Sequence, residues 1–299
     1  MTTPPAPRPF LKWAGGKTQL LPALISRLPP GIEDGSVRRY VEPFVGSGAL
    51  FFALAARHPV LDYRLYDANE EVALVYSVVR DRVEDLIVRL GVLDEAYREA
   101  GNEAREELYY TVRARFNAGG PDPVERAADL LFLNRTGYNG LYRTNARGGY
   151  NVPHGRYRRP QVCRPALLRS ASGALASARI GAGDFAASAD AVDDRTFVYL
   201  DPPYRPLTPT ASFTAYSRHR FGDEEQRRLA AYVRALDERG ALFMLSNSDP
   251  RNADPDDDFF DALYEGFVIE RVPARRMINR NGSGRGAVSE LLVRNYGSA

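Results

Sequence analysis

The chain has few residues of the types that build disulfides and metal centres. Its 299 residues include a single cysteine, Cys163, and three histidines. One cysteine excludes an internal disulfide, and so few cysteines and histidines argue against a zinc site. We therefore expect a protein of a reducing compartment whose chemistry needs no metal ion.

Long apolar runs are also missing. No unbroken hydrophobic stretch approaches the roughly 20 residues of a membrane-spanning helix. The N-terminal sequence MTTPPAPRP lacks the apolar core of a signal peptide. Hydrophobic residues nevertheless make up 44% of the chain, which is ample for a packed core. We expect a soluble, cytoplasmic protein of one or two domains.

The net charge is small but unevenly distributed. The formal net charge is +2, yet residues 134–169 contain eight arginines and no Asp, Glu or Lys, which leaves 32 basic against 38 acidic residues elsewhere. Glycines, asparagines and four tyrosines interleave with these arginines: Tyr138, Tyr142, Tyr150 and Tyr157. Arginine suits phosphates and guanine edges, and tyrosine suits stacking or wedging between bases. A flexible loop that happens to be arginine-rich is the alternative, but the absence of acids favours a nucleic-acid surface.

One stretch combines a carboxylate, backbone carbonyls and an aromatic ring at the end of an expected strand. The apolar run at 197–200 predicts a buried strand, and Asp201-Pro202-Pro203-Tyr204 follows it directly. Prolines lack N–H groups and have a fixed φ, which predicts a stiff loop with free carbonyls. Asp201 and the Pro202 carbonyl would accept both protons of an exocyclic amine, and Tyr204 would stack on a planar base. An ordinary strand-to-turn exit explains the same residues equally well.

Two other strand ends have the pattern of a nucleoside site. Residues 42–48 (EPFVGSG) form a glycine-rich turn between a strand at 38–41 and an apolar helix at 49–54, and Asp67 ends the next strand at 63–66. Glycines followed about 20 residues later by an acid are typical of folds that bind a ribose. Two glycines fall short of the dinucleotide fingerprint, and Asp67 alone fits a helix cap equally well.

The segment before an expected helix at 18–25 contains Gly15-Gly16-Lys17. This order suggests a phosphate loop, but the earlier glycine and the preceding strand are missing. Trp13 is the only tryptophan, and an isolated tryptophan is more often a core residue than a ligand contact.

The rest of the chain alternates strands and helices around a helical middle. Helical periodicity covers 72–134 and returns at 166–177 and 224–238. Strands are expected at 38–41, 63–66, 178–185, 197–200, 241–246, 267–272 and 290–294. A polar aromatic loop at 213–220 and a basic loop at 279–286, a candidate for gripping a nucleic-acid strand, lie in the second half. The pattern predicts an α/β protein with about seven strands.

Six motifs occur in one order: FLKWAGGK from Phe10, VEPFVGSG from Val41, YDAN from Tyr66, NRTGYNGLYR from Asn134, GDF from Gly183 and DPPY from Asp201. Together they closely resemble the Dam family of DNA adenine methyltransferases (D12 type, class alpha), from Phe10 to the last strand. The resemblance implies S-adenosylmethionine as methyl donor and a Rossmann-like methyltransferase sheet with helices on both faces. It also implies a mainly helical target-recognition domain at 73–166, between two parts of the catalytic domain at 1–72 and 167–299.

The resemblance assigns a donor site of nine residues: Trp13, Lys17, Phe44, Gly46, Gly48, Asp67, Asp184, Phe185 and Asp201. Phe44, Gly46 and Gly48 would lie along the methionine part of the donor. Asp184 and Phe185 would lie beside its adenine, and no metal is implied.

The catalytic residues implied by the resemblance are Asp201, Pro202 and Tyr204. If Asp201 and the Pro202 carbonyl accept the two N–H bonds of the target adenine, its exocyclic nitrogen can aim its lone pair at the methyl group. Tyr204 would hold the flipped base.

The recognition residues implied by the resemblance are Lys12, Tyr138, Asn139, Leu141, Arg143, Pro153 and Arg156. In Dam-like enzymes these positions read GATC, with Tyr138 and Asn139 wedging into the duplex. The chain departs from the family in small ways: Thr136 and Tyr142 occupy variable positions, and the last basic loop is less charged than in some members. We therefore expect double-stranded DNA as the partner and GATC, methylated at its adenine, as the site.

Two alternatives remain. A related enzyme would methylate cytosine N4 or RNA, although Asp rather than Ser before Pro-Pro favours adenine. A DNA-binding protein of the same fold could have lost catalysis, but Lys17, Asp67, Asp201 and Tyr204 are all intact. We expect the protein at the nucleoid with no obligate protein partner, and a cognate restriction endonuclease in the same cell is compatible with the sequence.

Overall fold

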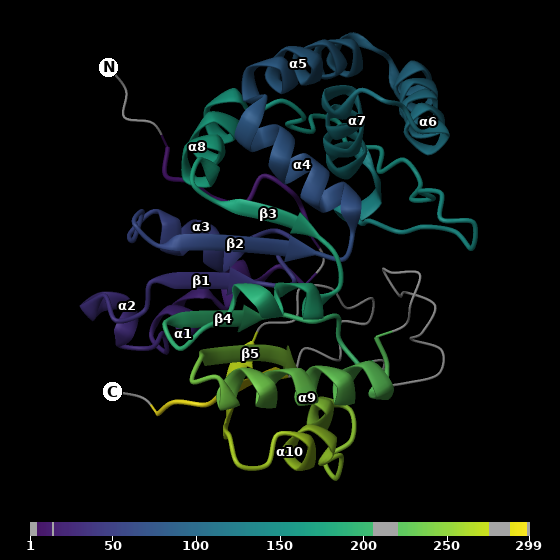
Figure 1. Ribbon diagram of the computed structural model, residues 1–299. Coiled ribbons are helices and arrows are strands. Elements are labelled where there is room, and N and C mark those ends of the chain that lie inside the picture. The colour runs from purple at the N-terminus through teal and green to yellow at the C-terminus, as the bar shows by residue number, and fades with distance from the viewer. Residues whose placement is uncertain (1–4, 14, 206–220, 275–287, 298–299) are drawn as a thin grey trace.

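A computed structural model of the chain describes residues 5–13, 15–205, 221–274 and 288–297. Its centre is a seven-stranded sheet of order β3-β2-β1-β4-β5-β7-β6, with helices on both sides (Figure 1). The predicted fold class and strand number are confirmed. The loops expected at 213–220 and 279–286 lie outside the described residues.

The strands are β1 Arg39–Glu42, β2 Asp62–Asp67, β3 Arg179–Ala182, β4 Thr196–Leu200, β5 Leu242–Ser248, β6 Val268–Ala274 and β7 Val288–Arg294. The first five are parallel, so their carboxyl ends meet at one edge of the sheet, at the right in Figure 1. β7 runs antiparallel between β5 and β6, with Glu290 opposite Ser248 at the last position of β5. The beginning of β7 therefore reaches the edge at which the parallel strands end.

Alternate residues of each central strand enter different cores, as the period of two requires. Tyr40, Phe197 and Tyr199 belong to the larger core, whereas Val41 and Val198 belong to the smaller one. Both sheet faces are therefore covered, which explains why β4 is buried at every position.

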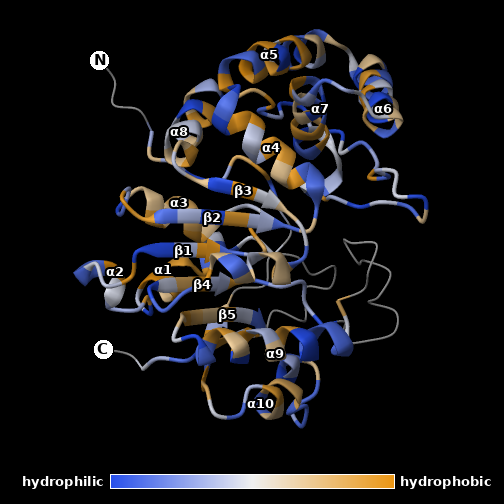
Figure 2. Ribbon diagram, in the orientation of Figure 1, coloured by the Kyte–Doolittle hydropathy of each residue, from blue (hydrophilic) through white to orange (hydrophobic). Residues whose placement is uncertain are grey.

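The larger core is covered by α1 Leu21–Ile25, α2 Gly31–Asp34, α3 Ala49–Ala55, α4 Glu70–Asp81 and α8 Pro165–Leu175. The smaller core is covered by η3 Phe185–Ala191, α9 Asp223–Glu238 and α10 Phe259–Leu263. In α9 the buried side chains recur at helical spacing, at Gln226, Leu229, Ala230, Val233 and Leu236. Figure 2 shows the matching alternation of hydrophilic and hydrophobic residues along α9.

The single helix expected at 18–25 is wrong. The chain forms a 3-10 turn, η1 Lys17–Gln19, and then the short helix α1, with Pro22 in its first turn. Proline has no N–H to continue the hydrogen-bond ladder but is accommodated at a helix start, so a new helix begins here.

Three further helices stand beyond α4: α5 Val83–Glu99, α6 Asn102–Ala118 and α7 Pro123–Thr136. The connection from α7 to α8 projects from the body at the same side as the carboxyl ends of the strands (Figure 1). The predicted domain boundaries at 72/73 and 166/167 fall inside α4 and α8, and that division stays a prediction. Within the described ranges, no helix has the length and apolar character needed to span a bilayer.

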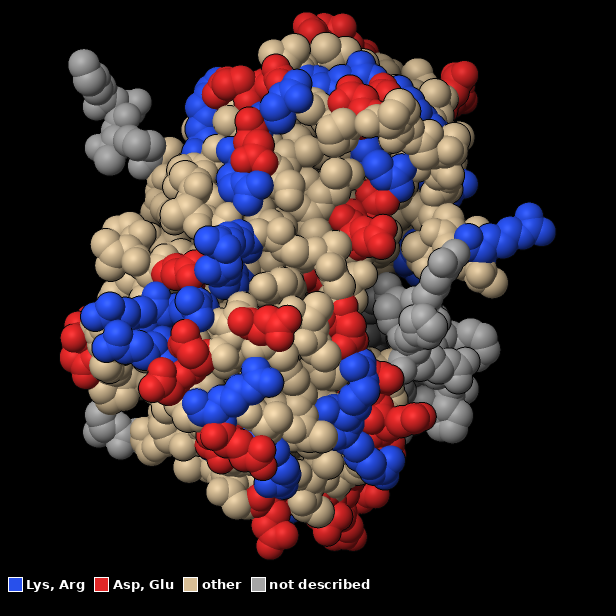
Figure 3. All heavy atoms as spheres, viewed as in Figure 1, with Lys and Arg blue, Asp and Glu red and all other residues tan. Residues whose placement is uncertain are grey.

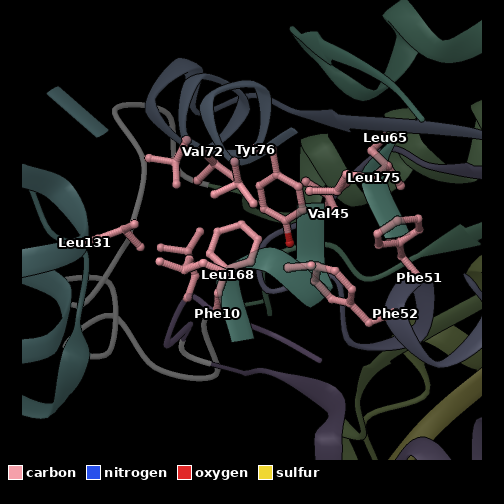
Figure 4. Packing of buried hydrophobic residues seen from close by; sticks show 14 of the residues in the cluster. Phe10, Val45, Phe51, Phe52, Leu65, Val72, Tyr76, Leu131, Leu168 and Leu175 are labelled. Carbon is pink, nitrogen blue, oxygen red and sulfur yellow. The ribbon is translucent and has the colours of Figure 1, made fainter. Parts of the chain in front are cut away.

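One hydrophobic core joins this helical layer to the sheet. Figure 4 shows side chains of α3, α4, α7, α8 and β2 packed together, among them Phe51, Val72, Tyr76, Leu131, Leu168 and Leu65. The helical layer therefore has no separate core of its own.

Candidate active site

Asp201 lies at the carboxyl end of β4, as the sequence predicts. Its Oδ1 accepts a hydrogen bond from Ser246 Oγ at 3.0 Å and lies 2.9 Å from Lys17 Nζ. Among the described residues, none donates to its Oδ2. Burial raises the pKa of the Asp201 carboxyl, and the Lys17 ammonium opposes that rise. One oxygen thus has two partners, and the other has none within the described ranges.

The two residues after Asp201 leave a second acceptor beside it. Pro202 is buried, and no donor within the described ranges bonds its carbonyl, whereas Gln226 Nε2 donates to the Pro203 carbonyl at 3.2 Å. Tyr204 is 38% exposed at the end of the loop. The loop therefore presents two unused acceptors and an accessible ring.

Lys17 is 5% exposed and lies against this loop. Its Nζ donates to Tyr204 Oη at 2.6 Å and lies 4.5 Å from the centre of the Tyr204 ring. A third oxygen, Glu290 Oε2 on β7, lies 3.3 Å from the same nitrogen. The sequence predicts Lys17 at the donor site but gives no signal for Glu290, which is 89 residues beyond Asp201 and enters only because β7 reverses direction.

The glycine turn after β1 and the end of β2 form one hydrogen-bonded unit. The Gly46 N–H donates to Asp67 Oδ2 at 2.9 Å, and the Asn69 N–H donates to Asp67 Oδ1 at 2.8 Å. Burial raises the pKa of Asp67 to about 6. Each carboxylate oxygen retains a second lone pair, so Asp67 can accept further hydrogen bonds from a ligand.

Both glycines of this turn have positive φ, 44° at Gly46 and 65° at Gly48. A Cβ at Gly46 would lie 2.7 Å from Trp13 Cδ1, and one at Gly48 would lie 2.6 Å from Tyr76 Oη. Trp13 therefore lies directly on the glycine turn and is half-buried, not a core residue. Only glycine satisfies both the conformation and the contact.

An aromatic cluster lies next to the turn. The Phe44 ring centre is 5.6 Å from that of Phe185 and 5.8 Å from that of Phe221. The Asp184 side chain caps η3 and binds Arg228 through both oxygens, at 2.8 and 2.6 Å. The structure thus brings Phe44 and Phe185 together, while the carboxylate of Asp184 is directed at Arg228.

The segment that carries most of the predicted recognition residues is tied to Lys12 in the N-terminal segment by a buried side chain, Asn134. Its Oδ1 accepts from the Lys12 N–H at 2.8 Å, and its Nδ2 donates to the carbonyls of Lys12 and Gly140 at 2.8 and 3.1 Å. Lys12 Nζ is then 5.0 Å from the centre of the Tyr157 ring. Two parts of the chain that are 122 residues apart are thereby fixed to each other.

Tyr138 and Asn139 occupy the tip of a turn. Tyr138 is 53% exposed, and its N–H donates to the carbonyl of the exposed Pro153 at 2.9 Å. Asn139 has φ 54°, a left-handed conformation that Asn tolerates better than most residues, and its N–H donates to Tyr157 Oη at 3.0 Å. The exposed tip is therefore held in place by the backbone hydrogen bonds of Tyr138 and Asn139.

The remaining recognition positions lie around this tip. Leu141 is half-buried, Arg143 Nε donates to Asn151 Oδ1 at 2.8 Å, and Arg156 is exposed with φ 53°. A groove nearby is lined by Lys12, Arg135, Tyr157, Arg158, Arg159, Pro160 and Gln161, with no acidic residue. Figure 3 shows basic side chains at the end of the projecting connection.

The interpretation of the four tyrosines is partly wrong. Tyr150 is 2% exposed and its hydroxyl bonds the Leu141 carbonyl, so it belongs to the core beneath the loop. Tyr142 is half-buried, with its ring centre 5.7 Å from that of Trp13. An arginine is also engaged internally, since Arg169 pairs with Glu84 on α5. The surface available for nucleic acid is therefore smaller than the sequence suggests.

Comparison with known proteins decides the family. The family model for "D12 class N6 adenine-specific DNA methyltransferase" matches residues 13–278. The chain belongs to the D12 class N6 adenine-specific DNA methyltransferases. It is 45% identical to the type II methyltransferase M.MjaIII of Methanocaldococcus jannaschii, over 97% of this chain and 99% of that protein. It is 38% identical to the DNA adenine methylase of Escherichia coli K12, over 96% of this chain and 94% of that protein.

Membership of the D12 methyltransferases implies S-adenosylmethionine as the donor and DNA as the substrate. The site fits such a donor on its own geometry. The half-buried Asp67 offers carboxylate oxygens to hydroxyls, and Phe44 with Phe185 offers apolar ring faces. The glycines let the turn between them pack directly against Trp13 and Tyr76. Within the described part of the chain, no cluster of three or more His, Cys, Asp or Glu is suited to a metal ion.

Proposed function

We propose that this D12 methyltransferase methylates the exocyclic N6 of an adenine flipped out of duplex DNA, within the sequence GATC. The observation that carries the chemistry is the pair of acceptors, Asp201 Oδ2 and the Pro202 carbonyl, to which no described residue donates, beside the 38% exposed Tyr204. An adenine amine has two N–H donors and a planar ring, so it matches this loop group by group.

The residues would act by orientation and charge. When bound, S-adenosylmethionine supplies an electrophilic methyl group on a cationic sulfur. Asp201 and the Pro202 carbonyl accept the two amine protons, which draws the nitrogen lone pair out of conjugation and points it at that methyl carbon. The positive charge that passes from sulfur to the amine nitrogen on methyl transfer would be stabilised by the Asp201 carboxylate, and the methylated nitrogen would then release one proton. Tyr204 stacks on the base.

The donor would be held by residues at or just after the carboxyl ends of β1, β2 and β3, at the same edge of the sheet. Asp67 accepts hydrogen bonds from hydroxyls, Phe44 and the glycine turn line the methionine part, and Asp184 with Phe185 lies beside the adenine. Arg228 occupies both oxygens of Asp184, so the carboxylate is oriented before the donor binds. Trp13 covers the glycine turn and closes this side of the site.

GATC recognition would come from the surface around the projecting tip. Lys12, Leu141, Arg143, Pro153 and Arg156 would read or flank the bases, and an arginine on a guanine edge contributes about 1–3 kcal/mol per base. Tyr138 and Asn139 would wedge into the duplex, in keeping with their exposed positions. The division into a recognition domain at 73–166 between two catalytic parts is part of this proposal. The enzyme needs no metal and no obligate protein partner, and a cognate restriction endonuclease is compatible with it.

Nucleoside mass spectrometry tests the proposal. Two unmethylated duplexes, one with a single GATC and one with that site scrambled, are incubated with protein and S-adenosylmethionine. N6-methyladenine in the first alone is the expected result. Methyladenine in both duplexes would refute GATC as the site, and methylcytosine would refute adenine as the target base. Donor binding without any methylated product would indicate a DNA-binding protein that has lost catalysis.

Asp201→Ala tests the mechanism. We expect DNA binding to persist and methylation to fall by about 100-fold or more, because the variant loses an acceptor that orients the amine. Single-turnover methyl transfer and DNA affinity are measured on the same preparation. Turnover at the wild-type rate would refute the mechanism.

A further inference from the structure

Glu290 is a carboxylate at the active site that neither the motifs nor the proposed mechanism uses. It lies on β7, 20% of its side chain is exposed, and its Oε2 is 3.3 Å from Lys17 Nζ. That oxygen is buried. Among the described residues it forms this ion pair but no hydrogen bond. A buried carboxylate oxygen without a hydrogen bond is costly, so its position calls for a reason.

Lys17 has three N–H donors, and three oxygens surround it. Tyr204 Oη, Asp201 Oδ1 and Glu290 Oε2 lie 2.6, 2.9 and 3.3 Å from its Nζ. An ammonium that donates to a hydroxyl and lies between two carboxylates has a fixed position. In this position it engages the Asp201 oxygen that Ser246 also bonds, and so leaves Oδ2 for a substrate.

The identity of residue 17 supports this interpretation. The chain contains only two lysines, Lys12 and Lys17, among 40 lysines and arginines. A compact ammonium fits between three converging oxygens, whereas a planar guanidinium fork does not. Lysine is thus present at a site that suits its geometry, in a chain whose basic residues, apart from Lys12 and Lys17, are arginines.

We propose that Glu290 is a positioning residue that acts through Lys17: it holds the ammonium away from Asp201 Oδ2 and so keeps that oxygen free for the target amine. This inference rests on the proposed adenine methylation. Without the charge of Glu290, Asp201 would be the remaining carboxylate beside Lys17, and the ammonium would shift toward it and engage Oδ2 as well. The target amine would then compete with the Lys17 ammonium for Asp201 Oδ2.

Glu290→Gln tests the proposal, because it removes the charge and keeps the shape. We expect single-turnover methyl transfer at saturating donor and DNA to fall about 100-fold, as for other losses of orientation. Dissociation constants for donor and for DNA should stay within about twofold, because Glu290 contacts neither in this scheme. Glu270→Gln is the matched control. Glu270 lies on the neighbouring strand β6, pairs with Arg27 and Arg294, and should keep the wild-type rate.

A second measurement follows the Lys17 charge itself and needs no turnover. With two lysines in the chain, isotope-labelled lysine gives two side-chain signals in an NMR titration, and Lys12→Ala assigns them. In wild type Lys17 should remain protonated above the usual lysine value of about 10.4. In Glu290→Gln its midpoint should fall by about one pH unit or more, since one of its two anionic partners is gone.

The outcomes separate the two proposals. Wild-type protein that fails to methylate adenine overturns the proposed function, and the NMR titration then decides alone whether Glu290 governs Lys17. Active wild type with an unimpaired Glu290→Gln variant overturns the role of Glu290. Equal losses of donor binding and of rate would also overturn it, because Glu290 would then be a donor contact.

Discussion

The buried side chain of Asn134 allows a sharp test of how recognition is built. It makes three hydrogen bonds that tie the backbone of Lys12 to the turn at Gly140, and it is 2% exposed. Asn134→Ala removes all three, of which the bond to the Gly140 carbonyl is buried and the two to Lys12 are partly buried. At about 1 kcal/mol for each bond, the loss is about 3 kcal/mol. This is a large share of the 5–15 kcal/mol typical of a folded domain, but it should leave the protein folded.

The assay pairs denaturant unfolding with methylation of duplexes that carry single-base substitutions in the proposed GATC site. We expect Asn134→Ala to lose about 3 kcal/mol and to relax discrimination at the base that Lys12 is proposed to read, because the Lys12 backbone is released. Asn295→Ala is the matched control. Asn295 also makes three hydrogen bonds, to Asp237, Ala241 and Phe243, at the far end of β7. It should also lose stability, by a smaller amount because Asn295 is half-buried and its bond to Asp237 is exposed, and it should keep full discrimination.

The reasoning would be refuted by one clear pattern. Suppose that Asn134→Ala and Asn295→Ala both lose stability and both discriminate among the substituted duplexes as wild type does, at all four bases of the site. Asn134 would then contribute to stability and not to recognition. Lys12 would in that case be placed by other contacts.

Three further predictions concern the donor site and the DNA surface. Gly46→Ala should weaken donor binding at least about 10-fold in calorimetry, because its Cβ would clash with Trp13 at a φ of 44°; unchanged affinity would remove the turn from the donor site. Because the pKa of Asp67 is about 6, its carboxyl takes up a proton below that pH and donor affinity should fall there, whereas Asp67→Asn should show a flat profile. Arg143→Ala should relax preference at one base pair, whereas Arg159→Ala, in the basic groove, should weaken all duplexes alike and reduce the salt dependence; a uniform loss in Arg143→Ala would assign it to phosphate.

Much of the fold could be predicted because its signals are local. The strand before Asp201 is an unbroken apolar run, and the turn at Gly46 precedes an apolar helix, so both strand ends could be placed from the sequence alone. The helix at 18–25 could not, because its period is helical but Pro22 starts a new helix within it.

The parts of the site that could not be predicted depend on contacts between distant segments. Glu290 is one of many acidic residues in the sequence, and its place beside Lys17 follows from the antiparallel insertion of β7. Tyr150 has the same sequence surroundings as Tyr138, yet one is core and the other a protruding tip. Burial of an aromatic side chain in an irregular loop is set by the helices beneath it, here α6 through Phe116, with its ring centre 6.0 Å from that of Tyr150.

The shared core of the sheet and the helical layer limits how such an enzyme can change its target. A recognition module that moves between proteins by recombination must keep its own interior intact. Here the side chains of α4, α7 and α8 pack with those of α3 and β2 in one core. Moving 73–166 as a block would therefore break packing contacts both in the protein that it leaves and in the protein that it enters. Under the proposed recognition scheme, a change of target sequence therefore calls for replacement of exposed side chains along 137–159 on an otherwise unchanged body.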